Sequence, residues 1–272
     1  MQHALEAGSV VAIVAGIIGY FVVLRRSSFA AHALSHIGFA GAAGAVLFGI
    51  SPVYGLLLFT SVGGSSMAIL SPRAAHRDVH IGTVLAFMLG LGVLFISLYT
   101  GYATEAYSIL FGEILGISAN DVLVTIVAAL IILPVVALAY RPLLFSSIDE
   151  DVAEAKGIPT LFLGVLFMLL VAAATSIAVQ VVGVLLIFSL MVTPAAIAQR
   201  LAKRPREVIM ISVAIALIAT WLGLLVSFFV FVSYPVSFFI TTIVFSFYLI
   251  VRFIYPRINP AKRSRPSFPE LK

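Results

Sequence analysis

Residues 31–44 read AHALSHIGFAGAAG and place two histidines, His32 and His36, inside an apolar run long enough to cross a membrane as a helix. Residues four apart lie on one face of a helix, so the two imidazoles can reach the same point. Ionisable groups are rare at membrane depth and usually face a cavity or the interior of a bundle. The pair therefore predicts a two-nitrogen metal site on a substrate pathway. The alternative is a pair of neutral packing histidines, hydrogen-bonded to a neighbouring helix.

Small residues follow the histidines. Gly38, Gly41 and Gly44, with alanines between them, leave one face of the expected helix almost without side chains. Membrane helices approach closely at such faces. We expect these glycines to pack a second helix beside the pathway.

Composition restricts the class of protein. The chain of 272 residues is 62% hydrophobic and 10% charged, with a mean hydropathy of +1.19. These values predict an all-α integral membrane protein with many spans. The formal charge of +5 indicates basic cytoplasmic loops rather than a nucleic-acid partner. Without cysteine, a transition metal can be held only by histidine, carboxylate, carbonyl or water, and we expect no permanently bound cofactor.

Apolar runs and basic residues together predict a topology. With the N-terminus outside and the C-terminus in the cytoplasm, all 16 Lys and Arg residues lie on the inner side, as the positive-inside rule requires. Glu6 stands where a signal peptide would be basic, so the first span is expected to be retained. Residues 1–255 then form the transmembrane domain, and residues 256–272 form a basic cytoplasmic tail in contact with membrane lipids. Nine runs are candidate spans: 7–24, 30–50, 53–70, 81–99, 121–140, 159–177, 180–198, 208–231 and 235–252.

One inner loop, RPLLFSSIDEDVAEAKGIPT at 141–160, carries helix signals of its own. Ser147 and Glu150 have the spacing of a capping box, and acidic residues suit the start of a helix. Gly157 followed by Pro159 is typical of a helix end. The loop predicts a short cytoplasmic helix at about 148–156 that can dock a partner.

Two further segments allow more than one interpretation. His76 and His80 also have metal-ligand spacing, but arginines around them would repel a cation, so ordinary inner-loop polarity is expected. The outer segment at 99–121 is rich in aromatic residues and fits either an interfacial helix or a surface for an external partner.

Five blocks in order resemble one family, the ABC-3 permease subunits of ATP-binding-cassette importers for zinc, manganese and iron. The resemblance covers nearly the whole chain. The blocks are AHALSHIGFAGAAGA at 31–45, DVHIG at 78–82, LFGEILGIS at 110–118, SIDEDVAEAKGI at 147–158 and GVLLIFSLMVTPAAIAQRLAKRP at 183–205.

The resemblance implies roles for the histidines. His36 matches the histidine of the family's motif, and His32 occupies the position where the family usually has aspartate. In the family, these two residues are thought to line the path of the ion. Imidazole in place of carboxylate removes a negative charge and offers a softer ligand, which favours Zn²⁺ or Fe²⁺ over Mn²⁺. Binding should weaken in acid, since both rings must be neutral to coordinate a metal.

The resemblance also implies partners. The 147–158 segment would be the coupling helix that contacts a cytoplasmic ATPase, through Ser147, Asp149, Glu150, Ala153 and Gly157. The chain has no G-x-x-x-x-G-K-[ST] sequence, so it is expected to be a permease and not an enzyme, with ATP hydrolysis on a separate subunit. The implied assembly is a homodimer in the inner membrane of a prokaryote, with two ATPase subunits and an extracytoplasmic metal-binding protein.

Two other functions remain open at this point. A permease for a metal chelate of the siderophore or cobalamin type would need a wider pathway without ligands for single ions. A secondary carrier driven by an ion gradient would be expected to show internal repeats and paired acids inside the membrane, and the spans show neither.

Overall fold

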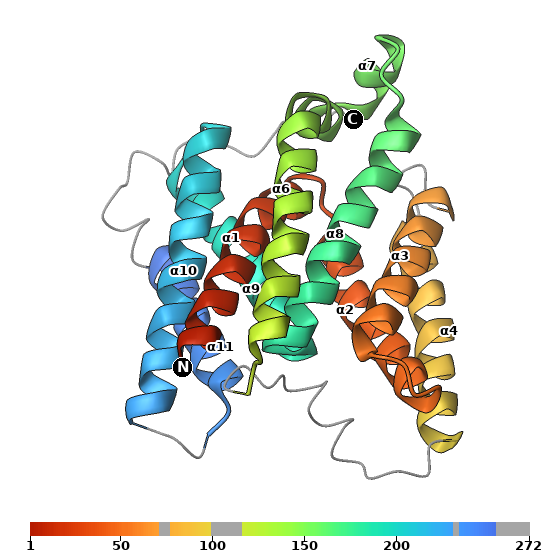
Figure 1. The fold of residues 1–272 in the computed structure, drawn as a ribbon. Helices are drawn as coiled ribbons and strands as arrows, with labels where there is room; N and C mark the ends of the chain where they lie inside the picture. The colour runs from red at the N-terminus through yellow and green to blue at the C-terminus, as the bar shows by residue number, and fades with distance from the viewer. Residues whose placement is uncertain (71–76, 99–115, 231–233, 254–272) are drawn as a thin grey trace.

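The protein is a bundle of α-helices (Figure 1). The computed structural model describes residues 1–70, 77–98, 116–230 and 234–253. The expected tail at 256–272, residues 99–115 of the expected outer segment at 99–121, and His76 lie outside these residues. The described helices are α1 (Gln2–Leu24), α2 (Ser28–Leu47), α3 (Pro52–Leu70), α4 (Arg77–Leu98), α6 (Ala119–Ile148), α7 (Glu150–Ala155), α8 (Thr160–Val182), α9 (Val184–Leu201), α10 (Pro205–Phe229) and α11 (Val236–Phe253).

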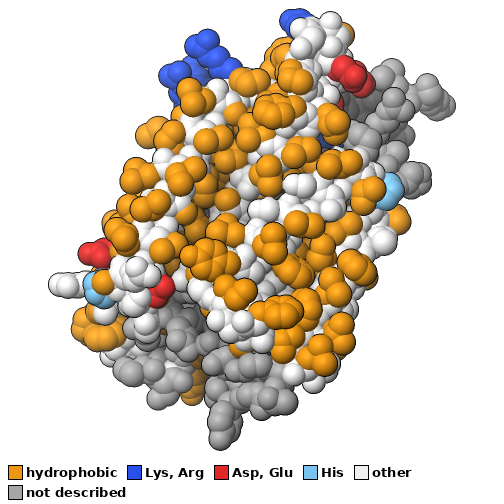
Figure 2. All heavy atoms as spheres, turned by 45° about the vertical axis from the view of Figure 1, so that its right-hand side comes forward, with side chains coloured by type: hydrophobic (Ala, Val, Ile, Leu, Met, Phe, Trp, Pro, Cys, Tyr) orange, Lys and Arg blue, Asp and Glu red, His pale blue; other side chains and the backbone are white. Residues whose placement is uncertain are grey.

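The helices confirm an all-α membrane architecture. Within the described residues, 8 helices are long and apolar enough to cross a membrane, and α9 supplies a shorter apolar helix. Every expected span is occupied by one of these. Figure 2 shows hydrophobic side chains across the middle of one face, with charged side chains gathered toward its ends. This distribution matches a surface that meets lipid in the middle and water at both ends.

Three helices form the centre of the bundle. α1, α2 and α8 are the most buried spans, whereas α4 and α11 are the least buried. α1 packs against α6, α8, α9 and α10, and α2 packs against α3, α4, α8 and α9. The helix with the histidine pair is therefore covered by its neighbours over most of its surface.

One expected helix boundary is wrong. The candidate spans 159–177 and 180–198 put the boundary between them at 178–179, but α8 continues to Val182 and the chain turns at Gly183, with φ of +84°. Residues with a side chain rarely adopt this conformation, so glycine ends α8 and begins α9 here. The apolar residues on both sides gave no sign of the turn because they suit either helix.

The end of α6 also differs from expectation. The predicted span at 121–140 continues as a helix to Ile148, and Ser147 lies in its last turn, where its hydroxyl donates to the carbonyl of Leu143. The expected capping box of Ser147 with Glu150 is therefore absent. Asp149 caps α7 instead, with Oδ1 accepting from the Val152 amide at 2.9 Å. Aspartate and serine are equally good caps, and the structure uses the one that follows the end of α6.

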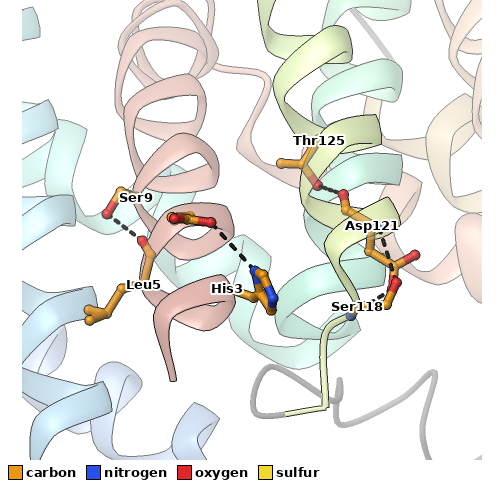
Figure 3. Close-up of polar contacts among 7 residues, drawn as sticks. His3, Leu5, Ser9, Ser118, Asp121 and Thr125 are labelled. Atoms are coloured by element: carbon orange, nitrogen blue, oxygen red, sulfur yellow. Dashed lines mark hydrogen bonds and ion pairs between the residues drawn. The ribbon is translucent and has the colours of Figure 1, made fainter.

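The opposite end of α6 carries a capping box that we did not predict (Figure 3). The Ser118 hydroxyl accepts from the Asp121 amide at 3.3 Å, and Asp121 Oδ2 accepts from the Ser118 amide at 3.1 Å. Asp121 Oδ1 also accepts from Gln180 Nε2 at 2.9 Å, which ties the start of α6 to the end of α8. His3 pairs with Glu6 at 3.6 Å at the same end of the bundle.

Candidate metal-transport site

The two histidines lie together on α2. The ring centroids of His32 and His36 are 4.7 Å apart, with an angle of 81° between the rings. Both side chains are partly buried, whereas Ser35 and Ile37 beside them are almost fully buried. The expected pairing on one helix face is therefore present.

An aromatic side chain holds the first of these rings. The centroid of Phe188 on α9 lies 4.9 Å from that of His32, in an edge-to-face arrangement. Nδ1 of His32 is buried and has no hydrogen-bond partner within the described part of the chain. A buried polar atom without a partner costs about 1–3 kcal/mol, which a bound ion would offset. The sequence marked 183–205 only as a family block and did not point to Phe188 as a neighbour of the site.

The described residues supply only part of a metal coordination sphere. Among the described residues, no group of three or more His, Cys, Asp or Glu side chains could hold an ion. Protein-bound zinc takes four ligands, commonly with imidazole nitrogens at about 2.0–2.1 Å. The histidine pair can provide two of them, so the other ligands must come from outside this set. His80, on α4, also has a buried Nδ1 without a partner in the described residues, but it belongs to no such group.

The glycines of α2 pack against neighbouring helices. A Cβ atom on Gly41 would lie 2.2 Å from the carbonyl oxygen of Gly55, so the backbones of α2 and α3 are in direct contact. A Cβ on Gly38 would meet Leu56 at 3.0 Å, and one on Gly44 would meet Phe95 of α4 at 2.9 Å. At these three positions the missing side chains leave room for close contact with the neighbouring helices. These contacts fix α2 between α3 and α4.

The short helix α7 has two different faces. Ala153 is fully buried, and α7 contacts the neighbouring helices α6 and α8. Asp149 and Glu150 are exposed, and Val152 is 43% exposed. Gly157 has φ of +78° and ends the helix as expected. A docking surface on α7 would consist of its acidic residues and Val152, an apolar residue that we had not selected.

An apolar bundle with two ionisable side chains in a buried span is a membrane protein with a candidate functional site inside it. The model of the ABC 3 transport family matches residues 1–255, and the chain belongs to this family.

Named relatives agree with that assignment. The chain is 32% identical to the "Manganese transport system membrane protein MntC" of Listeria monocytogenes, over 84% of this chain and 81% of the relative. It is 30% identical to the "High-affinity zinc uptake system membrane protein ZnuB" of Buchnera aphidicola, over 85% and 88% of the two chains. A structure of PsaBC from Streptococcus pneumoniae in complex with Fab contains a similar chain, with a TM-score of 0.83 and 31% identity, over 96% and 94%.

Proposed function

We propose that this chain is the permease subunit of an importer that moves divalent transition-metal ions into the cell, driven by ATP hydrolysis on a partner subunit. The observation that carries the proposal is the histidine pair in a buried span of a chain whose relatives are named for manganese and zinc transport. The inner end of the bundle is the end with Arg25, Lys156 and Arg204, because basic residues gather on the cytoplasmic side. The membrane is the inner membrane of a prokaryote.

A second copy of the chain would complete the site. The least buried residues of α2 form one stripe along the helix, with Phe29, His32, His36 and Phe39. A two-fold axis beside this stripe would bring two histidine pairs together and supply four imidazoles. α4 and α11 are the least covered spans and have the apolar surface that a homodimer would bury.

Transport assays separate this function from the two alternatives. Purified permease with its ATPase and an extracytoplasmic metal-binding protein should import radiolabelled Zn²⁺, Mn²⁺ or Fe²⁺ into proteoliposomes. Competition by free ions supports an ion as the substrate, whereas competition only by a siderophore or cobalamin supports a chelate. Uptake that continues without ATP while an ion gradient is present would instead support a secondary carrier.

The helix α7 is the proposed contact with the ATPase. Val152→Asp should weaken binding of the ATPase at least about tenfold, because a carboxylate would be buried in an apolar contact. Val152 is 43% exposed, so the substitution should leave the permease folded. Binding is measured by titrating the ATPase onto permease in nanodiscs.

The matched control is Val152→Thr, which keeps the shape and adds no charge. It should bind the ATPase close to wild type. Equal binding by the aspartate variant and the control would place the ATPase contact elsewhere on the inner surface.

His32 should also influence which metal is carried. In His32→Asp, a carboxylate replaces an imidazole, so the ratio of Mn²⁺ uptake to Zn²⁺ uptake should rise. The ratio is measured with both ions present at equal concentration. An unchanged ratio would mean that this side chain does not select the metal.

A further inference from the structure

Arg25, where α1 ends, lies between the two helices that flank α7. Its Nη1 atom donates to the hydroxyl of Ser146 at 3.2 Å and to that of Ser147 at 3.5 Å. Its guanidinium carbon lies 5.1 Å from the ring centre of Phe167 on α8. One side chain therefore contacts α6 just before α7 begins and α8 after α7 ends.

The turn from α1 to α2 is held by its own backbone. The amide of Arg25 donates to the carbonyl of Phe21, and that of Ser27 donates to Val22, both at 2.9 Å. Ser27 is 2% exposed. Arg26 has φ of +54°, a conformation that residues with a side chain adopt only when the surroundings require it. These contacts join the turn directly to the start of the helix that follows.

That following helix is α2. The amide of Ala31 donates to the carbonyl of Ser27 at 3.0 Å in the first turn, and His32 comes next in the chain. Arg25 is thus joined on one side to the helices around α7 and on the other to the helix with the histidine pair.

We infer that Arg25 is a positioning residue that links the docking helix α7 to α2, so that movement of α7 driven by the ATPase displaces His32 and His36. The inference rests on the proposed function, because it takes α7 as the site where the ATPase acts. It adds a route by which that action reaches the metal site.

Arginine suits this position better than lysine. Its planar guanidinium can donate to two hydroxyls and stack on an aromatic ring at the same time, which a lysine ammonium cannot do. A general role as a membrane anchor would need only a positive charge at the surface. The exposed side chain of Arg26 meets that requirement, whereas Arg25 is partly buried among its partners.

The link is tested by the number of ions imported for each ATP hydrolysed. In proteoliposomes with the ATPase, Arg25→Gln should lower this ratio at least about fivefold. Coupling between two sites typically changes affinity by a factor of about 5 or more, so loss of the coupling should have an effect of at least this size. The ATPase should remain bound. Arg26→Gln removes the same charge at the adjacent position and should leave the ratio unchanged.

The serine partners provide a second test. Replacement of both Ser146 and Ser147 by alanine should lower the ratio as Arg25→Gln does. Combining all three substitutions should add little, since they break one interaction. A ratio that stays at the wild-type value in Arg25→Gln, or that falls equally in Arg26→Gln, would overturn the link.

A readout that does not depend on the cargo separates this inference from the proposed function. The chain has no cysteine, so a fluorophore can be attached at one new cysteine, at Phe29 on α2 or at Glu154 on α7. ATP should change the signal at both positions in the wild-type background. With Arg25→Gln, the response at Glu154 should remain and that at Phe29 should be lost.

If no metal ion is imported but the labels respond in this way, the proposed metal cargo is wrong, and the inference that Arg25 links α7 to α2 is supported. If the label at Phe29 responds to ATP equally with and without Arg25, or does not respond in the wild-type background, the link is wrong whatever the cargo.

Discussion

Replacing His32 or His36 by alanine is expected to reduce metal uptake by more than about tenfold, with the ATPase still bound. Outer-shell partners of metal ligands already contribute factors of roughly 10–100 in affinity or activity, and a ligand should contribute more. The two rings lie 4.7 Å apart, so loss of one leaves a single imidazole of the pair. Uptake of radiolabelled Zn²⁺, Mn²⁺ and Fe²⁺ is measured in proteoliposomes with the complete assembly.

His3→Ala is the matched control. It also removes an imidazole, but from an exposed residue near the start of α1 that pairs with Glu6. Uptake in this variant should equal that of the wild type. Normal uptake in both His32→Ala and His36→Ala would make the pair packing residues and leave the metal-transport proposal without its site.

Gly41→Ala is expected to lower the apparent melting temperature by roughly 5 °C or more. The new methyl group would lie 2.2 Å from the carbonyl oxygen of Gly55, so α2 and α3 would have to separate. Overpacking of this kind typically costs about 1–3 kcal/mol, and more when backbone must shift. The measurement is the fraction of detergent-solubilised protein that stays monodisperse after heating.

Gly90→Ala provides the comparison. Gly90 lies within α4, and a Cβ atom there would meet nothing within 4 Å. Its melting temperature should be unchanged or slightly raised, because alanine favours a helix more than glycine. Equal effects of the two substitutions would mean that α2 and α3 do not depend on this contact.

The class of fold could be predicted from local composition. A helix in a membrane satisfies its own backbone hydrogen bonds, so a long apolar run is enough to specify it. The spacing of His32 and His36 likewise specified that they share a face, since that property belongs to a single helix. The break between α8 and α9 could not be placed in this way. Gly183 stands among residues that suit either helix, and only the packing shows that the chain turns there.

In the inner loop, neighbouring residues predicted the short helix correctly but did not predict its cap. The acidic residues and Gly157 correctly predicted a short capped helix near 148–156. The cap itself was wrong, because Ser147 lies in α6 and accepts a hydrogen bond from Arg25. That contact joins residues far apart in the chain, and no local pattern reveals it. The burial of Ala153, which the resemblance places in the contact with the ATPase, is likewise visible only in the structure.

The sequence by itself determined a helical membrane protein, the expected spans, the two histidines on one helix face and a short helix at the inner end. These properties depend on apolar length, helical period and capping, all of which act between residues near one another in the chain. The tertiary structure alone decided that Phe188 packs on His32, that Gly41 meets Gly55, and that Arg25 joins α1 to α6 and α8. Such contacts depend on which helices become neighbours. The apolar helices have similar compositions, so the sequence of one helix does not show which other helix packs against it.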